Sequence, residues 1–394
     1  MIQALLAVAI VGATVHTGEG PPIQDATVLI EGNRIAAVGT EVELPSGTRI
    51  VEAQGRVVTP GLVEPYARLG LDEVRLEPSA VEGTAGSSYD PVRGTLRVWD
   101  TFNPLSPLLA QAHRGGITSA VIVPTGGLVT GQSAWVDLTP EGPVREAPVA
   151  IHIDLTGLGR EEGARTRAFL RLREVLEDAR LFRANRGPYI AGKLRELSVS
   201  GSDLEVLARA LDAKLLVVLE VDRAPGIRTT LEIIRDHRLR ACLLGVQEGW
   251  LVAEEIARAG VPVLVDPLDD LPRSFSSLHA RPDNATRLRR AGVEVAFTGR
   301  GTARTIERLR HLAGNAVAAG FSYDDAIAAI TRVPAEIFGI VDAGTLRPGA
   351  LANLVVWNGD PLELMTWAVQ VYIRGEQVSL RSRQELLTDR YRSR

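Results

Sequence analysis

Carboxylate and amide side chains follow several short apolar runs in the second half of this 394-residue sequence. Glu220 and Asp222, for example, come at the end of a run that begins at Leu215. The oxygen atoms of such side chains bind hard cations or cationic ligands where several of them converge. Arginines near them would instead pair with the carboxylates and offset the cost of burying charge, and we expect this second arrangement. The acidic and amide residues are Glu220, Asp222, Gln247, Glu248, Asp266 and Asp269, and the arginines are Arg68, Arg223 and Arg300.

The histidines do not have the spacing of a metal centre. No two of them lie two or four residues apart, the spacings that let imidazoles on one strand or helix share a metal. His152 and Asp154 end a strand-like run, but a single His-x-Asp pair is weak evidence, so we expect His152 to line a pocket or serve the structure. The six histidines are His16, His113, His152, His237, His279 and His311.

Two further motifs are incomplete. The glycine-rich segment 124–132 lacks the Gly-Lys-Ser/Thr ending of a phosphate-binding loop, and it is expected to be a loop after a strand. No serine lies in a Gly-x-Ser-x-Gly turn, so serine-based hydrolysis is not predicted either. Cys242 is the only cysteine, stands in an apolar run and is expected to be buried.

The middle of the chain alternates β-type runs with helical patterns. This rhythm predicts βαβ units with a parallel sheet, and the number of units favours a closed barrel over an open sheet. The carboxyl ends of the strands, where barrels keep their active sites, would then gather the side chains named above. The expected strands are 119–123, 149–153, 215–221, 241–246, 261–265 and 293–297, and the expected helices are 165–184, 203–211, 227–237, 251–259, 284–291 and 304–319.

Both ends of the chain have short β-type runs separated by turn signals. Glu31-Gly-Asn-Arg34, between two β-branched runs, is a good hairpin signal. Strand rhythm returns at 354–357 and 369–373, so one small sheet is expected to be shared by the two termini. The predicted fold class is α/β, a (β/α)₈ barrel over residues 60–340 with a composite β-sandwich domain over residues 1–59 and 341–394.

Composition limits the classes of function. Hydrophobic residues make up 45% and charged residues 23%, as in an ordinary soluble protein, and the net charge of -4 gives no reason to expect nucleic acid. The apolar start, residues 1–15, lacks a positive leader and is too short to span a membrane. The sequence does not fix the compartment: we expect a soluble protein that is either cytoplasmic or exported with its signal removed.

Several segments in the right order resemble the amidohydrolase superfamily, more narrowly its imidazolonepropionase-like group. Residues 26–39 are similar to the hairpin of that family's sandwich, and residues 55–63 to its entry into the first barrel strand. Residues 334–340, 344–349 and 352–361 resemble its return to the sandwich. The resemblance implies a TIM barrel and, in active members, a divalent metal held by histidines and an aspartate.

The ligand positions depart from the family pattern. Where the family has Pro-Gly-Leu-Ile-Asp-x-His-x-His, this chain has Pro60-Gly-Leu-Val-Glu-Pro-Tyr-Ala-Arg68, so Tyr66 and Arg68 align with the two histidines. A guanidinium has no lone pair to give and repels a cation. Glu220 aligns with the fifth-strand histidine, and Gly299 with the aspartate that acts as base on the eighth strand. We therefore expect no metal and no cofactor.

The expected function is that of a catalytically degenerate relative of metal-dependent amidohydrolases. Such a protein would be a non-catalytic subunit of an active paralogue, a homo-oligomer, or a binder of a small molecule in the old pocket. Its pocket is expected to hold Tyr66, Arg68, His152, Asp154, Glu220, Asp222, Arg223, Gln247, Glu248, Gly299 and Arg300.

Two alternatives stay open. One is a hydrolase of amide or cyclic amide bonds that uses Glu220, Asp222 and Glu248, with a zinc-like metal if any. The other is one half of a heteromer that makes contact through apolar loop residues, unless these simply cover the barrel. The loop residues are Trp99, Phe102, Phe275 and Leu278.

Overall fold

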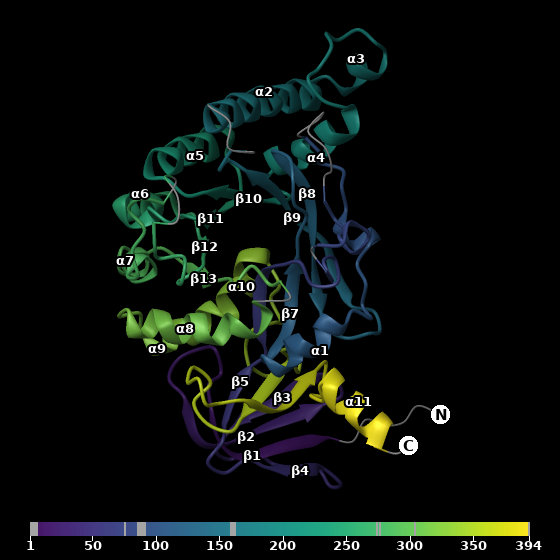
Figure 1. The fold of residues 1–394 in the computed structure, drawn as a ribbon, viewed down its shortest axis with the longest axis vertical. Helices are drawn as coiled ribbons and strands as arrows, with labels where there is room; N and C mark the ends of the chain where they lie inside the picture. The colour runs from purple at the N-terminus through teal and green to yellow at the C-terminus, as the bar shows by residue number, and fades with distance from the viewer. Residues whose placement is uncertain are drawn as a thin grey trace.

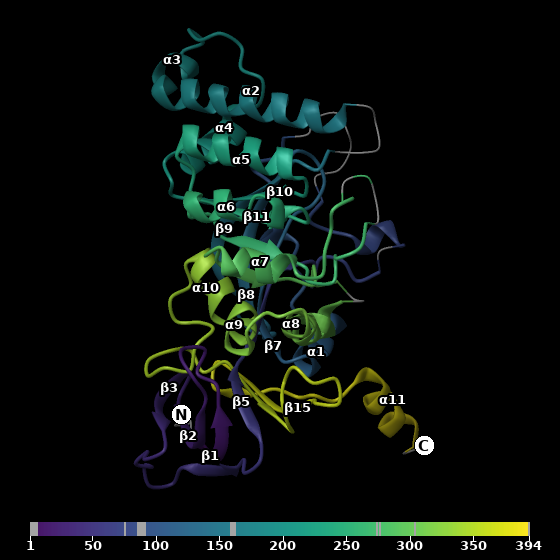
Figure 2. The same ribbon diagram turned by 90° about the vertical axis from the view of Figure 1, so that its left-hand side faces the viewer.

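Two sheets of eight strands organise the computed structural model, which describes residues 7–74, 76–84, 92–157, 163–272, 275, 277–302 and 305–392. Figures 1 and 2 show the terminal sheet at one end of the molecule and the barrel sheet, with helices along its outside, at the other. The predicted combination of a barrel with a sheet from both termini is confirmed.

The barrel sheet has its strands in chain order, and nearly closes on itself. All neighbours are parallel except at one strand, β8, which runs antiparallel to both β7 and β9. Only short loops join these three strands, and a parallel pair needs a longer crossover. The strands are β6 (Leu62–Ala67), β7 (Ile117–Ile122), β8 (Val129–Asp137), β9 (Val144–Asp154), β10 (Leu216–Val221), β11 (Ala241–Gly245), β12 (Val263–Val265) and β13 (Val295–Phe297).

The expectation that segment 124–132 is a loop was therefore wrong for its last residues, because β8 begins at Val129. The strand is buried along its whole length, although its sequence mixes polar and small residues with apolar ones and gives no clear strand pattern.

Helices follow β9 to β13 and cover the outside of the barrel (Figure 2). α2 is the longest of the described helices, and its buried side chains pack toward the barrel core. The helices are α1 (Pro107–Arg114), α2 (Ala164–Ala184), α3 (Arg186–Ile190), α4 (Gly201–Leu211), α5 (Ala224–His237), α6 (Ala253–Ala259), α7 (Asn284–Arg290), α8 (Leu309–Ala318), α9 (Tyr323–Ala329), α10 (Arg332–Phe338) and α11 (Arg383–Arg392).

Alternation along β10 sets which side chains reach the barrel interior. Leu216 and Val218 belong to the cluster inside the barrel, whereas Val217 and Leu219 pack in the cluster under the helices. Because successive strand residues face opposite sides, Glu220 lies on the interior side as well. The carboxyl end of β10 thus points a carboxylate into the barrel mouth.

The terminal sheet combines both ends of the chain. β14 pairs with β5, so a strand from near residue 356 lies beside one from near residue 58. The domain limits at residues 59 and 341 stay predictions. The strands are β1 (Val8–Val15), β2 (Ile23–Glu31), β3 (Arg34–Gly39), β4 (Arg49–Glu52), β5 (Val57–Pro60), β14 (Leu354–Trp357), β15 (Ala368–Ile373) and β16 (Glu376–Gln377).

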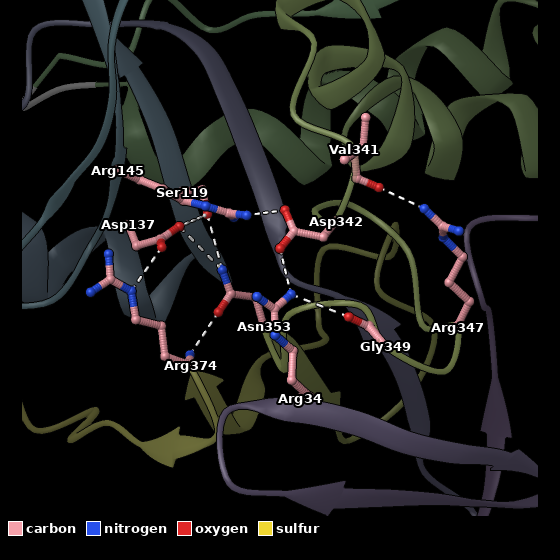
Figure 3. Close-up of polar contacts among 10 residues, drawn as sticks. All are labelled: Arg34, Ser119, Asp137, Arg145, Val341, Asp342, Arg347, Gly349, Asn353 and Arg374. Atoms are coloured by element: carbon pink, nitrogen blue, oxygen red, sulfur yellow. Dashed lines mark hydrogen bonds and ion pairs between the residues drawn. The ribbon is translucent and has the colours of Figure 1, made fainter.

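A buried polar network joins the terminal sheet to the barrel (Figure 3). Asp137 of β8 is fully buried and accepts hydrogen bonds from Ser119 Oγ at 2.9 Å and from Arg374 Nε at 2.9 Å. Asn353 donates to Ser119 Oγ at 3.1 Å and accepts from the backbone N–H of Arg374 at 2.7 Å. Asn353 and Arg374, next to strands of the terminal sheet, thus bond to Ser119 and Asp137 of the barrel sheet, and this network fixes the two sheets relative to each other.

No helix in the described part of the chain is both long and apolar enough to cross a membrane.

Candidate functional site

An ion pair crosses the mouth of the barrel. Arg300, just after β13, places its Nη1 atom 2.7 Å from Oε1 of Glu220, at the end of β10. The Arg300 guanidinium also lies over the ring of Tyr66, with Cζ 5.6 Å from the ring centroid. Tyr66 in turn meets the ring of His152 edge-on, at 5.8 Å between centroids. Four of the predicted pocket residues are thus brought together.

Arg300 is held in an unusual backbone conformation. Its φ of 53° lies in the left-handed region, which non-glycine residues seldom adopt. The backbone N–H of Arg300 donates to Thr298 Oγ1 at 3.0 Å, which helps to hold this turn. Strain of this kind is often kept at functional sites, where it aims a side chain.

The mouth holds more acid than base. Burial raises the pKa of Glu220, although the Arg300 charge opposes the shift. Burial raises the pKa of Asp222 to about 7, and the nearby Glu220 carboxylate adds to the effect. Asp154 lies beside Glu220 in the sheet and accepts hydrogen bonds from Thr156 N at 2.8 Å and Thr156 Oγ1 at 2.6 Å. Arg300 is the guanidinium whose charge acts on both Glu220 and Asp222.

His152 is neutral and lacks hydrogen bonds. Burial lowers its pKa to about 3, and neither ring nitrogen has a partner in the structure. The imidazole lies beneath Tyr66 inside the barrel, with only 3% of the residue exposed. This position fits the prediction that His152 lines the pocket.

Arg68 does not face the mouth, so the expected pairing of Arg68 with the barrel carboxylates was wrong. Its Nη2 atom lies 2.5 Å from Asp72 Oδ1, and Nη1 donates to the carbonyl oxygens of Gly83 at 3.0 Å and Val123 at 2.8 Å. The pairing of β6 with β7 is irregular between Glu64 and Ala67, which disturbs the alternation that would place Tyr66 and Arg68 on one face. Arg68 instead fixes the loop that follows β6.

The other predicted side chains lie beside the mouth. Gln247 donates to Asp269, and Glu248 bonds to the backbone N–H of Ala224 at 3.1 Å and to His279 Nδ1 at 3.0 Å. Burial acts to raise the pKa of Glu248, but the hydrogen bonds outweigh it and the pKa is lowered. The structure therefore separates Glu248 from Glu220.

Arg223 is the N-cap residue of α5 and has no ion pair in the described part of the chain, so its expected pairing with the barrel carboxylates was wrong too.

Glu64 is a site residue that the sequence reasoning missed. It is fully buried and accepts hydrogen bonds from Thr298 Oγ1 at 2.5 Å, Gly299 N at 3.0 Å and Tyr66 N at 3.2 Å. Burial raises its pKa to about 7, against the effect of these hydrogen bonds. An acidic residue inside the apolar run 61–67 was the signal that could have revealed it. Its carboxylate lies against Gly299, because a Cβ at residue 299 would come 3.5 Å from Glu64 Oε2.

Two of the four apolar loop residues lie on the surface. Phe275 is 82% exposed and Leu278 is 50% exposed, whereas Trp99 and Phe102 pack against the barrel core.

In the described residues, no group of three or more His, Cys, Asp or Glu side chains is arranged to hold a metal ion.

Comparison with known proteins gives the family. The Amidohydrolase family model matches residues 177–378, half of the chain, and this protein belongs to that family. Members of the family are typically metal-dependent.

Curated relatives agree with this assignment. The chain is 24% identical over 404 residues to the imidazolonepropionase of Rhizobium meliloti, covering 90% of each chain. It is 22% identical over 375 residues to the dihydroorotase of Lactobacillus johnsonii, covering 84% of this chain and 85% of that one. A third relative, amidohydrolase tasK of Hapsidospora irregularis, is 26% identical over 328 residues, which cover 68% of this chain but only 32% of the relative.

Solved structures share the fold. An amidohydrolase from Thermotoga maritima superposes with a TM-score of 0.84 at 24% identity and covers 95% of this chain and 100% of its own. Molinate hydrolase superposes with a TM-score of 0.60 at 20% identity, covering 95% of both chains. At these identities the likeness extends to the architecture alone.

Proposed function

We propose that this chain is a member of the Amidohydrolase family that does not carry out metal-dependent hydrolysis and that binds a small ligand at the barrel mouth. It would act alone, as a homo-oligomer, or as the non-catalytic subunit of an active paralogue. The observation that carries the proposal is the ion pair between Arg300 and Glu220, 2.7 Å long, across the mouth. In this ion pair the Arg300 guanidinium provides the positive charge at the mouth, where an active relative would hold a metal ion.

The donor set of the mouth does not fit a divalent metal. A cation beside Glu220 would meet the positive charge of Arg300, which is 2.7 Å from that carboxylate. Arg68, which we align with a ligand histidine, has no lone pair and is engaged with Asp72. Gly299, aligned with the aspartate base, has no side chain, and the Glu64 carboxylate beside it already accepts three hydrogen bonds.

A ligand of the mouth would meet a defined set of groups. Arg300 can bind an anionic or carbonyl group by charge-assisted hydrogen bonds, and the Tyr66 ring offers an apolar face below it. Asp222 can donate or accept a hydrogen bond near neutral pH, because its pKa is about 7. These groups favour a small polar molecule with both donor and acceptor atoms.

A second candidate, a hydrolase of amide or cyclic amide bonds, is favoured by one observation. Asp222 has a pKa of about 7, which suits a group that takes and returns a proton. Of the other two carboxylates that this alternative assumed, Glu220 is paired with Arg300 and Glu248 is bonded to His279. The alternative therefore depends on Asp222 with Glu220.

Turnover assays separate the two candidates. Purified protein would be incubated with N-acyl amino acids, dipeptides and lactams beside a heat-killed sample, together with Glu220→Gln and, as a matched control, exposed Glu41→Gln. The proposal predicts no turnover above the heat-killed sample for any of the three proteins. Turnover that persists in Glu41→Gln and disappears in Glu220→Gln would contradict it and support the hydrolase.

A further inference from the structure

A second pocket lies outside the barrel, beyond the carboxyl ends of β9 and β10. Its volume is about 240 Å³, and residues from the first turns of α2 and α5 line it. Figure 2 shows α2 and α5 on the same flank of the barrel. Tyr66, Glu220 and Arg300 of the mouth do not line this pocket, whereas Asp222 lies between the two, so the pocket adjoins the mouth.

Arg223 is the side chain in this pocket that lacks an acceptor. Its Nε atom is buried without a hydrogen-bond partner. By contrast, Arg228, further along α5, pairs with Glu255 at 2.9 Å. Arg223 as a whole is only partly buried and forms no ion pair in the described part of the chain, so the remaining N–H groups of its guanidinium can donate charge-assisted hydrogen bonds to a ligand.

The charge of the pocket favours an anion. Arg165 and Arg223 line it, and Asp222 is the one acidic side chain among the described lining residues. The charges that act on Asp222 include Glu220, Arg300 and Asp154 of the mouth, so its carboxyl group belongs largely to that site. The start of α5 adds little to this preference, because the backbone N–H of Ala224 is bonded to Glu248 and Pro225 has no N–H.

The wall of the pocket is apolar on one side. Phe169 of α2 and Val221 of β10 line it, next to Gly226 of α5. A Cβ at residue 226 would come 3.0 Å from Val221 Cγ2 and 3.7 Å from Phe169 Cζ. The glycine therefore keeps open the space beside the Phe169 ring, where an apolar part of a ligand would fit.

We propose that this pocket binds the carboxylate of a small organic acid, with the Arg223 guanidinium as the anion contact and the apolar part of the acid beside Phe169. The site goes beyond the proposed function of the mouth and does not depend on it. Benzoate is a suitable probe, because it joins a carboxylate to one flat apolar ring that can pack against the Phe169 ring.

Isothermal titration of the full chain with sodium benzoate tests the proposal, with benzamide as the uncharged counterpart and inorganic phosphate as the anion without an apolar part. Three variants are compared: Arg223→Gln removes the charge, Thr229→Trp fills the pocket, and Arg228→Gln removes a paired arginine of the same helix. Circular dichroism establishes that each variant is folded.

The proposal predicts that benzoate binds and that benzamide and phosphate bind at least roughly tenfold more weakly. Arg223→Gln and Thr229→Trp should each weaken benzoate binding by about tenfold or more, whereas Arg228→Gln should not change it. No benzoate binding, or binding that Arg223→Gln leaves unchanged, would overturn the proposal. Phosphate binding as tight as that of benzoate would overturn the assignment to organic acids. If Thr229→Trp does not fold, the result with Arg223→Gln decides.

Discussion

The carboxylate of Glu64 accepts a hydrogen bond from the backbone N–H of Gly299, with 3.0 Å between Oε2 and N. Glu64 belongs to the first barrel strand and Gly299 follows the last one, so a side chain joins the two strands where the barrel sheet closes. The described parts of β6 and β13 form no backbone ladder with each other, although Arg68 N donates to Gly301 O at 2.9 Å nearby. A buried acid therefore takes part in closing the barrel.

The ionisation of Glu64 should make stability depend on pH. Its pKa is raised to about 7 in the folded chain, above its ordinary value of 4.5, so the folded state holds the proton more tightly than the unfolded state. The contribution of Glu64 is then greatest below pH 4.5, falls as the pH rises to about 7 and is constant above that. At about 1.4 kcal/mol per pKa unit, the loss over this window is on the order of 3 kcal/mol.

Urea denaturation between pH 4 and 8 measures this effect by comparing the wild type with Glu64→Gln. The variant should be less stable at low pH, since an amide cannot satisfy both Thr298 and Gly299 as the acid does, and the deficit should shrink as the pH rises. Exposed Glu41→Gln is the control and should show a constant difference from the wild type. A deficit for Glu64→Gln that is the same at every pH would exclude the role given to Glu64.

Asp137 should be important for the union of the two sheets. Asp137→Ala leaves Arg374 without its buried partner and removes the acceptor of Ser119, so we expect a loss of about 3–5 kcal/mol in the free energy of unfolding. Asp100→Ala, which breaks the exposed pair with Arg97, should cost less than about 1 kcal/mol. Chemical denaturation measures the free energy of unfolding of both variants. Equal losses would show that the network in Figure 3 stabilises the fold no more than an exposed ion pair does.

Arg68 should stabilise the loop after β6 rather than shape the mouth. Arg68→Met removes the ion pair with the buried Asp72 and the donors to the carbonyl oxygens of Gly83 and Val123, so about 3–5 kcal/mol of stability should be lost. The double variant Arg68→Met with Asp72→Asn should recover part of this loss, because it also removes the buried negative charge that Arg68 helps to balance. If Arg68→Met is as stable as the wild type, the structural role of Arg68 is wrong.

Much of the barrel could be predicted because its local signals agree with its final structure. The apolar runs at 215–221 and 293–297 contain β10 and β13, and Glu220 lies at the carboxyl end of its strand, as predicted. The pairing of Arg300 with Glu220 was expected on charge alone, and the structure confirms it.

The sequence could not reveal features that depend on distant pairing. The irregular register of β6 against β7 turns Arg68 away from the mouth, although a spacing of two residues predicts a shared face with Tyr66. β8 was not predicted as a strand, because its residues 129–137 mix polar and apolar types, and its direction depends on the loops that join it to its neighbours. Glu64 was missed because an acid buried against the last strand is recognised only when that strand is in place.

Metal content is the measurement that most directly tests the claim that the chain supplies its own cation at the mouth. The protein would be purified without chelator, incubated with zinc, manganese or nickel, dialysed and analysed by inductively coupled plasma mass spectrometry, with Arg300→Ala measured in parallel. We predict far less than one metal ion per wild-type chain. Near-stoichiometric metal in the wild type, lost together with a hydrolytic activity on chelation, would contradict the account.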